Sequence, residues 1–495
     1  MSDTATSSED LTLRQSIALN PRPAAVWTAV LLVLLALEFG ALLETLLLVV
    51  EGVITAYPLG DPWLPTVQAW KASAGQIPTL LTRELIPNQG WRASANGPWM
   101  GTFPRNLGVG FGLEPKFAWL LRVVLIYGYA AVLLGWIFYG YDVFRRHYRM
   151  ADWTPRDDVV RRLRNHSWGK FGLAVVFAFL VMAIFAPALG PTTLERNIIE
   201  PYSYQTKYFN EETGQVETVY VGQANSNSES RGAGDRNIGP WTYDDYGRFH
   251  PFGTLPDGKD LFTFMMYGAR VSLFVGLLAI GIMGVMATAF ALLTAYYKGL
   301  VDLAVVIAGD SVMAIPQLLL LILVSAVFQG HWLDEIYNGG LLIALVFGLT
   351  GWPFLWRAVR GPAFQISTEE WIDAAKSYGQ RASVTMRKHM LPYVVGYLLI
   401  YASMTLGGVI IGTSALGFLG IGIHSPTPEW GRAVAMGQPY VATQSWHVSL
   451  LPGIMIVLVV TAFNALGDGI RDAIDPQSKG AETGTAGAAA AGGGG

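Results

Sequence analysis

The sequence of 495 residues lacks cysteine altogether, and only 14% of its residues are charged. Without cysteine, a disulfide scaffold, a cysteine-ligated metal centre and a cysteine nucleophile are all excluded. Soluble domains carry about 25% charged residues, so the charge here is too sparse to cover a soluble protein of this length. The net charge of -3 also argues against nucleic-acid binding, which requires a basic surface. These absences exclude a soluble enzyme.

Motifs that bind phosphate or carry out catalysis are also missing from the sequence. Lys170 and Lys259 each follow a glycine, but Phe171 and Asp260 come next, so neither lysine completes the G-x-x-x-x-G-K-[ST] loop that cradles ATP phosphates. The seven histidines form no HExxH motif or i, i+4 pair, and no G-x-S-x-G elbow occurs. We therefore expect no enzymatic activity, no cofactor and no metal site on this chain.

Apolar residues are abundant instead, at 52% of the chain. A helix needs about 20 apolar residues to cross a bilayer, and only helices or closed barrels satisfy the backbone in lipid. Strand-like alternation is absent, which favours helices. The sequence therefore predicts an all-α polytopic membrane protein with about eight transmembrane helices, near residues 24–50, 117–141, 171–188, 271–295, 303–328, 339–356, 394–416 and 450–466.

The distribution of Lys and Arg predicts how the chain is oriented. Basic residues gather in 142–170 and 357–392, whereas 330–338 has none and 417–448 has only Arg432. Because basic loops stay in the cytoplasm, the first two segments should be cytoplasmic and the other two external. Both termini are then expected in the cytoplasm. A prokaryotic cell membrane fits the lack of cysteines and of eukaryotic targeting signals.

Three acidic residues, Glu38, Glu44 and Asp310, fall within apolar runs. An ionised group in lipid is expensive, so each should be neutral, paired or turned toward protein or water. Asp310 is a candidate for the translocation path or for helix packing, since either an opposite charge or a solute would satisfy it. Pro316 is also a candidate for the translocation path or for helix packing, because a proline within a helix is expected to kink it.

The segment 367–392 between the sixth and seventh spans reads STEEWIDAAKSYGQRASVTMRKHMLP. Thr368 is expected to cap a helix whose first turn holds acidic residues, which suits the helix dipole. Gly379 can take the left-handed conformation that ends this helix. A second, basic helix over 380–390 should follow, and Pro392 should open the next span, where its missing N–H costs little. The pattern predicts a helix–turn–helix on the cytoplasmic face.

This segment resembles the EAA loop of binding-protein-dependent ABC importer permeases through Asp373-Ala374-Ala375, Gly379 and Leu391-Pro392. An ordered series of further segments resembles the C-type subunit of the dipeptide and oligopeptide permeases. These segments are HPFGT at 250–254, DGKD at 257–260, YGAR at 267–270, AIP at 314–316, FLGIG at 418–422, PTPEWG at 426–431 and GDGIRD at 467–472. The chain departs from this pattern at Asp373, where Glu is usual, and at Leu255, where Asp is usual.

The resemblance implies a domain organisation. A six-helix type I permease core would span 158–476, with an external insert at 190–269 and the cytoplasmic EAA loop at 367–392. Residues 1–157 have no counterpart in the usual subunit, and we expect an extension with two helices and an external loop. The Gly/Ala-rich tail 477–495 has nothing to bury and is expected to be disordered.

The resemblance also implies site residues and partners. A second permease subunit of the B type, two ATPase subunits that hold ATP and Mg, and an extracytoplasmic substrate-binding protein would complete the transporter. Pro426, Pro428 and Trp430, in an external segment rich in Pro and Trp, are expected either to contact the binding protein or to form a rigid loop that closes the mouth of the bundle. The residues expected to couple the chain to the ATPases are Glu370, Asp373, Ala374, Ala375, Gly379, Leu391 and Pro392.

Di- or oligopeptides are the expected substrates, and nickel or oligosaccharides are alternatives because related permeases carry them. A different class of protein, a secondary transporter that works alone, would need inverted repeats or a chain of buried charges. The missing ATP-binding motif and the EAA loop together favour the ABC importer.

Overall fold

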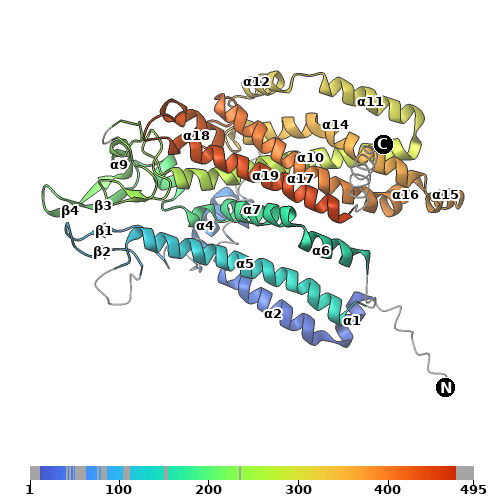
Figure 1. Cartoon of the computed structure of the whole chain (residues 1–495), viewed down its shortest axis with the longest axis horizontal. Helices are drawn as coiled ribbons and strands as arrows, with labels where there is room; N and C mark the ends of the chain where they lie inside the picture. The colour runs from blue at the N-terminus through green and yellow to red at the C-terminus, as the bar shows by residue number, and fades with distance from the viewer. Residues whose placement is uncertain are drawn as a thin grey trace, which may run out of the picture. The chain divides into compact units, whose positions relative to one another are not determined.

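The computed structural model describes residues 12–40, 43, 46–47, 50, 63–74, 77, 79, 86–103, 112–149, 154–233 and 236–474. Glu44 and the tail 477–495 lie outside the described residues, and the expected first span is described only in part. The chain divides into two compact units (Figure 1). Unit 1 comprises Met1–Pro155, Gln205–Val219 and Tyr243–Phe249, and unit 2 comprises Arg156–Tyr204, Tyr220–Thr242 and His250–Gly495.

The described part of unit 1 contains a helix pair and short strands. Its elements are α1 (Leu13–Leu19), α2 (Pro21–Leu37), α4 (Leu64–Ala74), β1 (Trp91–Arg92), β2 (Trp99–Met100), α5 (Pro115–His147), β3 (Gln205–Asn210) and most of β4 (Gln215–Tyr220). Trp99 stacks on Tyr243 with ring centroids 5.5 Å apart, beside a cavity of about 560 Å³ that Arg92 and Tyr208 also line.

Helices α2 and α5 run antiparallel and are joined by side-chain hydrogen bonds to the backbone. The indole of Trp27 donates to the carbonyl of Trp136 over 3.0 Å, and the indole of Trp136 donates back to the carbonyl of Trp27 over 3.1 Å. Nearer the ends, Tyr129 donates to Leu34 and Tyr148 to Asn20. Polar contacts of this kind hold helices together in lipid, where no hydrophobic effect drives them together.

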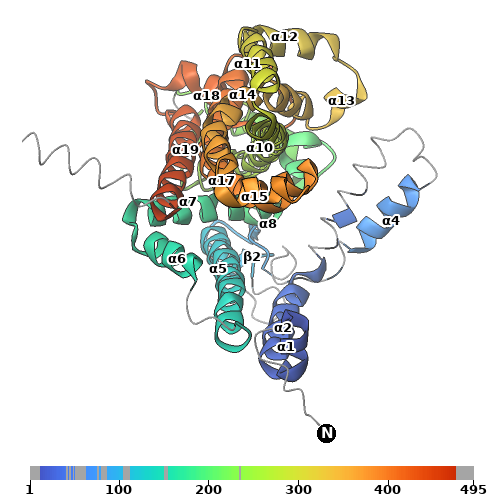
Figure 2. The same ribbon diagram turned by 90° about the vertical axis from the view of Figure 1, so that its right-hand side faces the viewer.

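Unit 2 contains most of the described helices, both the long apolar ones and the short ones between them. They are α6 (Pro155–Asn165), α7 (Ser167–Ile184), α8 (Ala186–Leu189), α10 (Leu261–Tyr297), α11 (Gly299–Met313), α12 (Gln317–Val327), α13 (Trp332–Glu335), α14 (Gly340–Ser367), α15 (Glu370–Ser377), α16 (Ala382–Thr385), α17 (Leu391–Phe418), α18 (Trp430–Gly437) and α19 (His447–Ile474). The external segment adds α9 (Val221–Asn227), β5 (Thr242–Tyr243) and β6 (Phe249–His250). Figure 2 shows α10, α14, α17 and α19 nearly end-on, gathered into one bundle.

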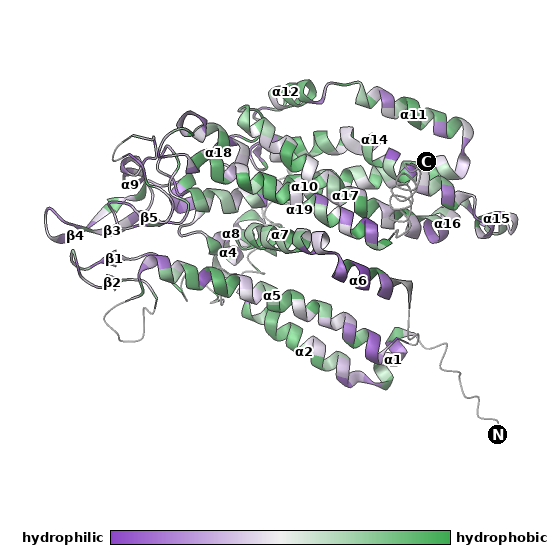
Figure 3. Ribbon diagram, viewed as in Figure 1, coloured by the Kyte–Doolittle hydropathy of each residue, from purple (hydrophilic) through white to green (hydrophobic). Residues whose placement is uncertain are grey.

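The expected all-α polytopic fold is confirmed. Among the described residues, six helices are long and apolar enough to cross a membrane, and two bent pairs bring the number up to eight. Figure 3 shows apolar residues along these helices, whereas α6 is largely hydrophilic. One bent pair is α1 with α2, and the other is α11 with α12, which meet at 73°. Pro316 directly precedes α12 and cannot donate the hydrogen bond that would continue α11.

Close packing of α10 on α14 forms the centre of unit 2. Ala287, Ala291 and Ala295 recur every fourth residue on α10, and all are fully buried. On α14, a Cβ added at Gly351 would lie only 2.4 Å from the side chain of Met283. Small residues at this spacing let two backbones approach, which is how helices gain packing energy in lipid.

Helix α7 approaches α19 through a glycine. A Cβ at Gly172 would lie 2.6 Å from the backbone carbonyl oxygen of Ala462 and 2.6 Å from the amide of Leu466. Backbone atoms cannot move aside as a flexible side chain can, so a larger residue must push the two helices apart.

Gly172→Ala is therefore expected to destabilise unit 2 by about 1–3 kcal/mol through overpacking. The measurement is the thermal unfolding midpoint in detergent. Gly281→Ala in α10 is the matched control, because nothing lies within 4 Å of its added Cβ. The control should be neutral or slightly stabilising, since alanine favours helix over glycine. Equal midpoints for the two variants would contradict the close α7–α19 contact.

Candidate functional site

Helix α15 is anchored to the membrane core by two residues. Ile372 is fully buried and belongs to the same hydrophobic cluster as Met390 and Val394. The ring of Trp371 lies 5.8 Å from His389 and 5.7 Å from Tyr393, at the beginning of α17. The position of α15 is therefore fixed relative to the base of a membrane-spanning helix.

The opposite face of α15 is open. Glu370, Asp373 and Ala374 are exposed, Ala375 is half-buried, and Tyr378 is 92% exposed. The ion pair from Lys376 to Asp373 is long, at 3.5 Å, and such exposed pairs contribute little. The face therefore presents acids and small residues, next to an aromatic ring that our sequence analysis did not single out.

The turn after α15 confirms the conformation expected of Gly379, whose φ is +73°. The expected capping residue was wrong. Glu369 is the N-cap of α15, while Thr368 ends α14 and its hydroxyl donates to the carbonyl of Gln365 over 2.8 Å. A threonine hydroxyl at a helix end can bond back to the preceding turn, and this bond removes it from the capping role.

The expected second helix over 380–390 is not separate from the membrane span. Helix α16, a π-helical turn at Met386–Met390 and α17 form one continuous element from Ala382 to Phe418. Pro392 cannot donate to the carbonyl four residues earlier, and the π-helical turn lies directly before it. Leu391 and Pro392 thus lie where α15 packs on the base of the span.

The segment 426–431 is built around buried residues. Trp430 has no exposed surface, its indole donates to the carbonyl of Met265 over 2.8 Å, and its ring packs on Phe179. Pro428 is also buried, whereas Pro426 is half-buried. The expectation that Trp430 and Pro428 contact a binding protein is therefore corrected. Their side chains hold the loop in place and are not accessible to a partner.

Glu429 caps α18 from within the protein. Its carboxylate accepts hydrogen bonds from the amides of Gly431 at 2.9 Å and Arg432 at 2.8 Å, and the residue is 0% exposed. Gly417 on α17 leaves space for the carboxylate of Glu429, because a Cβ at Gly417 would lie 1.7 Å from that carboxylate. Burial raises the pKa of Glu429 to about 7, although these amides and the charge of Arg432 act in the opposite direction.

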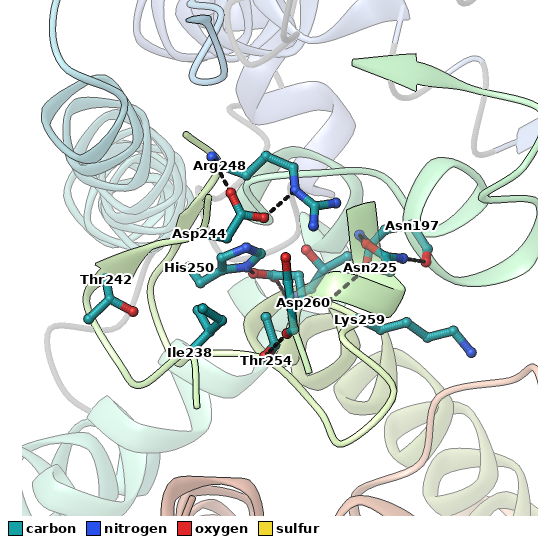
Figure 4. A network of polar contacts seen from close by, with 12 residues as sticks. Asn197, Asn225, Ile238, Thr242, Asp244, Arg248, His250, Thr254, Lys259 and Asp260 are labelled. Atoms are coloured by element: carbon teal, nitrogen blue, oxygen red, sulfur yellow. Dashed lines mark hydrogen bonds and ion pairs between the residues drawn. The ribbon is translucent and has the colours of Figure 1, made fainter. Parts of the chain in front are cut away.

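A buried polar network joins the segment that precedes α10 to the first turn of that helix (Figure 4). The carboxylate of Asp260 accepts from the amide of Thr263 at 2.6 Å and contacts Nδ1 of His250 at 2.9 Å. The amide of Asp260 donates to the side chain of Asn197, which in turn donates to Asn225. The segments 250–254 and 257–260 therefore have a structural role, which is to fix the insert on α10.

Two further residues of the same segment fit closely against their surroundings. Gly258 has a φ of +75°, and a Cβ there would lie 1.7 Å from the carbonyl oxygen of Asn225, so only glycine fits. Leu255, the departure from the usual Asp, is fully buried. An apolar side chain suits that position, because a buried carboxylate would need a partner.

The acidic residue Asp310 lies on α11 and forms an ion pair with Arg357 of α14. The sequence analysis assigned Arg357 to a cytoplasmic basic segment, but it lies within the helix Gly340–Ser367. Asp302 likewise pairs with Arg360 of the same helix. The sequence analysis placed both arginines in the basic segment 357–392 and so ended the span at residue 356, whereas the helix continues to Ser367. The remaining members of the expected site, Glu370 to Pro392, lie on α15, on the turn after it and at the beginning of α17.

Comparison with known proteins identifies the family. The model described as "binding-protein-dependent transport system inner membrane component" matches residues 284–480, and that of the "N-terminal TM domain of oligopeptide transport permease C" matches 154–210. The dipeptide transport system permease protein DppC of Alkalihalophilus pseudofirmus is 30% identical over 326 residues, which cover 66% of this chain and 91% of the relative. The chain belongs to the binding-protein-dependent transport permeases.

Other permeases show the same relationship. The glutathione transport system permease protein GsiD of Escherichia coli is 34% identical over 327 residues, covering 66% of this chain and 92% of that protein. The probable D,D-dipeptide transport system permease protein DdpC of Escherichia coli is 32% identical over 234 residues, or 47% of this chain and 76% of its own length. The resemblance inferred from the sequence is thereby confirmed.

The buried carboxylate of Glu429 makes the stability of this permease depend on pH. Its pKa rises from 4.5 to about 7 on folding, so the folded state binds the proton more tightly. The resulting stabilisation is fully present below pH 4.5 and is lost as the pH rises toward 7, and it is on the order of 3 kcal/mol. Thermal unfolding in detergent should therefore show a higher midpoint at pH 5.5 than at pH 8.

The matched control is Glu429→Gln, which keeps the shape and one acceptor but does not titrate. Its midpoint should vary less between pH 5.5 and pH 8 than that of the wild-type protein. The same pH dependence in both proteins would show that Glu429 does not carry the effect.

Proposed function

We propose that this chain is the C-type membrane subunit of an ATP-driven importer of di- and oligopeptides. The observation that carries the proposal is similarity over nearly the full length of permeases named for dipeptides and for glutathione, itself a tripeptide. The translocation path would run between this chain and a second, B-type permease subunit. A substrate-binding protein outside would deliver the peptide, and two ATPase subunits inside would hold ATP and Mg.

The face of α15 supports coupling to an ATPase. A short helix with one face anchored by Ile372 and Trp371 can transmit a displacement to α17, because it cannot slide on the core. Its exposed acids, Glu370 and Asp373, can meet basic residues across the joint, and Ala374 allows close approach. Tyr378 adds the kind of aromatic anchor that often dominates binding energy at protein interfaces.

We further propose that the permease domain covers 158–476 and that residues 1–157 form an additional two-helix extension. Basic residues in the 142–170 segment support a cytoplasmic position for that segment, and with it cytoplasmic termini in a prokaryotic cell membrane. Of the three expected binding-protein contacts, Pro426 retains a partly exposed side chain, and it neighbours the exposed His424 and Ser425.

The experiment that tests the proposed function is purification of the complex in mild detergent followed by mass spectrometry. We expect two ATPase subunits and a second permease to copurify, and a peptide to be the ligand trapped in the binding protein. Recovery of this chain alone from cells that express those ATPases would favour a transporter that works by itself. A nickel ion or an oligosaccharide in the binding protein would overturn the peptide assignment alone.

Gly379→Asp should reduce uptake at least tenfold while leaving membrane insertion intact. Within the described part of the chain nothing lies within 4 Å of a Cβ at Gly379, so a steric clash inside the chain does not account for such a loss, and the control below separates backbone strain at its φ of +73° from a defect at the joint with a partner. The new carboxylate would also face the negative end of the α15 dipole. The measurement is uptake of labelled peptide by proteoliposomes with ATP inside.

The matched control is Gly379→Asn, which has the same size, tolerates the left-handed conformation and adds no charge. It should retain most of the uptake. Full activity of the Asp variant would contradict the coupling role of this turn, and equal loss in both variants would assign the defect to the backbone.

A further inference from the structure

Three polar contacts follow one another along the seam between α11–α12 and α14. The amide of Gln317 donates to the hydroxyl of Thr350 over 2.9 Å, Arg357 pairs with Asp310, and Arg360 binds Asp302 through two contacts of 2.9 and 2.5 Å. We call these six residues the polar seam. Polar pairs in register along one helix seam are uncommon in a membrane interior and call for a physical reason.

The ion pair of Asp310 with Arg357 lies at membrane depth. Ten residues separate Arg357 from the cytoplasmic end of α14 at Ser367, and eleven separate Asp310 from the start of α11 at Gly299. At a rise of 1.5 Å per residue, both lie about 15–17 Å from the cytoplasmic ends of their helices. Helix α14 has 28 residues and is therefore about 42 Å long, so a hydrocarbon core of about 30 Å centred on this helix would still contain Arg357.

The two ion pairs of the seam differ in exposure. The side chains of Asp310 and Arg357 are 57% and 47% exposed, whereas those of Asp302 and Arg360 are 19% and 36% exposed. Charged side chains inside a membrane face protein or water and avoid lipid. The open side of Asp310 and Arg357 must therefore border water or another subunit in the assembled transporter.

The two arginines also differ in how firmly they are held. Arg360 binds both oxygens of Asp302 and lies over the rings of Trp356 and Phe364, at 5.5 and 4.8 Å from their centroids. Arg357 contacts one oxygen of Asp310 and is half-exposed. A guanidinium has five N–H donors in a planar fork that matches a carboxylate, so Arg357 retains donors for a second acid.

We propose that the polar seam lines the solute path and that Arg357 binds the carboxylate of a passing solute in place of Asp310. The inference rests on the proposed import of peptides, whose free C-terminus supplies that carboxylate. Asp310 holds and neutralises the guanidinium when no solute is present, and the solute carboxylate exchanges with it. Arg360 stays fixed on Asp302 and keeps α11 against α14 during the exchange.

The position of the seam can be tested by cysteine labelling, because the natural chain contains no cysteine to remove. Phe354→Cys on α14 and Ile307→Cys on α11 place a thiol on exposed positions beside the seam. Val285→Cys on α10 is the control. It is 72% exposed, apolar and twelve residues from the cytoplasmic end of its helix, so its depth matches that of the seam.

The assembled transporter in proteoliposomes is treated with a negatively charged, membrane-impermeant methanethiosulfonate, with and without ATP. Cysteines at 354 and 307 should react and uptake should fall, whereas the cysteine at 285 should stay unmodified because it faces lipid. No reaction at 354 and 307 in either condition would overturn the path assignment. Equal reaction at all three positions would overturn it too, because the seam positions would then be no more accessible to water than the control position on α10.

The role of Arg357 can be tested with trialanine and its C-terminal amide. Arg357→Gln should raise the KM for trialanine at least tenfold and leave that for the amide nearly unchanged, whereas Arg357→Lys should restore part of the difference. A purely structural role would impair both peptides equally, and that result would overturn the proposal. If the wild-type transporter takes up neither peptide, the peptide assignment fails together with the carboxylate exchange, and the labelling still decides whether the seam lines a path.

Discussion

The contact between α10 and α14 is the packing interaction on which the rest of the permease core depends. Alanines on one helix and glycines on the other bring the two backbones together, which replaces the hydrophobic effect that lipid cannot supply. Helix α14 then carries the two seam arginines toward α11 and ends just before α15. A bulky residue at Gly348, where an added Cβ would lie 2.8 Å from the Cβ of Ile282, would push the two helices apart and move all of these groups together.

Asp260, Glu429 and the charged residues of the polar seam each have a specific partner. Asp260 and Glu429 cap α10 and α18 on the external side, and both are almost completely buried. The charged pairs of the polar seam lie deeper, where an unpaired Asp or Arg costs about 2.5–3.5 kcal/mol by insertion measurements. The external caps therefore give the loops a fixed shape. In the polar seam, each charge is paired with an opposite charge, which lowers the free-energy cost of placing it in the membrane. In the proposed mechanism, the pair of Asp310 with Arg357 exchanges with the carboxylate of a solute, whereas the pair of Asp302 with Arg360 stays intact.

Helix α15 links the end of α14 to the base of α17. It follows α14 directly and packs on the base of α17 through Trp371 and Ile372, so a displacement of α15 acts on both helices. In the proposed importer, ATP-driven movement of the ATPase subunits would reach Arg357 through only ten residues of α14. Rigid helical connections transmit such a displacement better than loops do, and Gly379 confines the bend to the exposed end of α15.

The sequence by itself determined the class of protein, the approximate number of spans and the left-handed turn at Gly379, because these follow from local composition and from the conformational freedom of one residue. Only the tertiary structure showed that Trp430 is a packing residue and that Arg357 lies in a helix opposite Asp310. Their roles depend on partners 165 and 47 residues away in the chain. Hydropathy averaged over a window contains no information about which distant side chain a residue will meet.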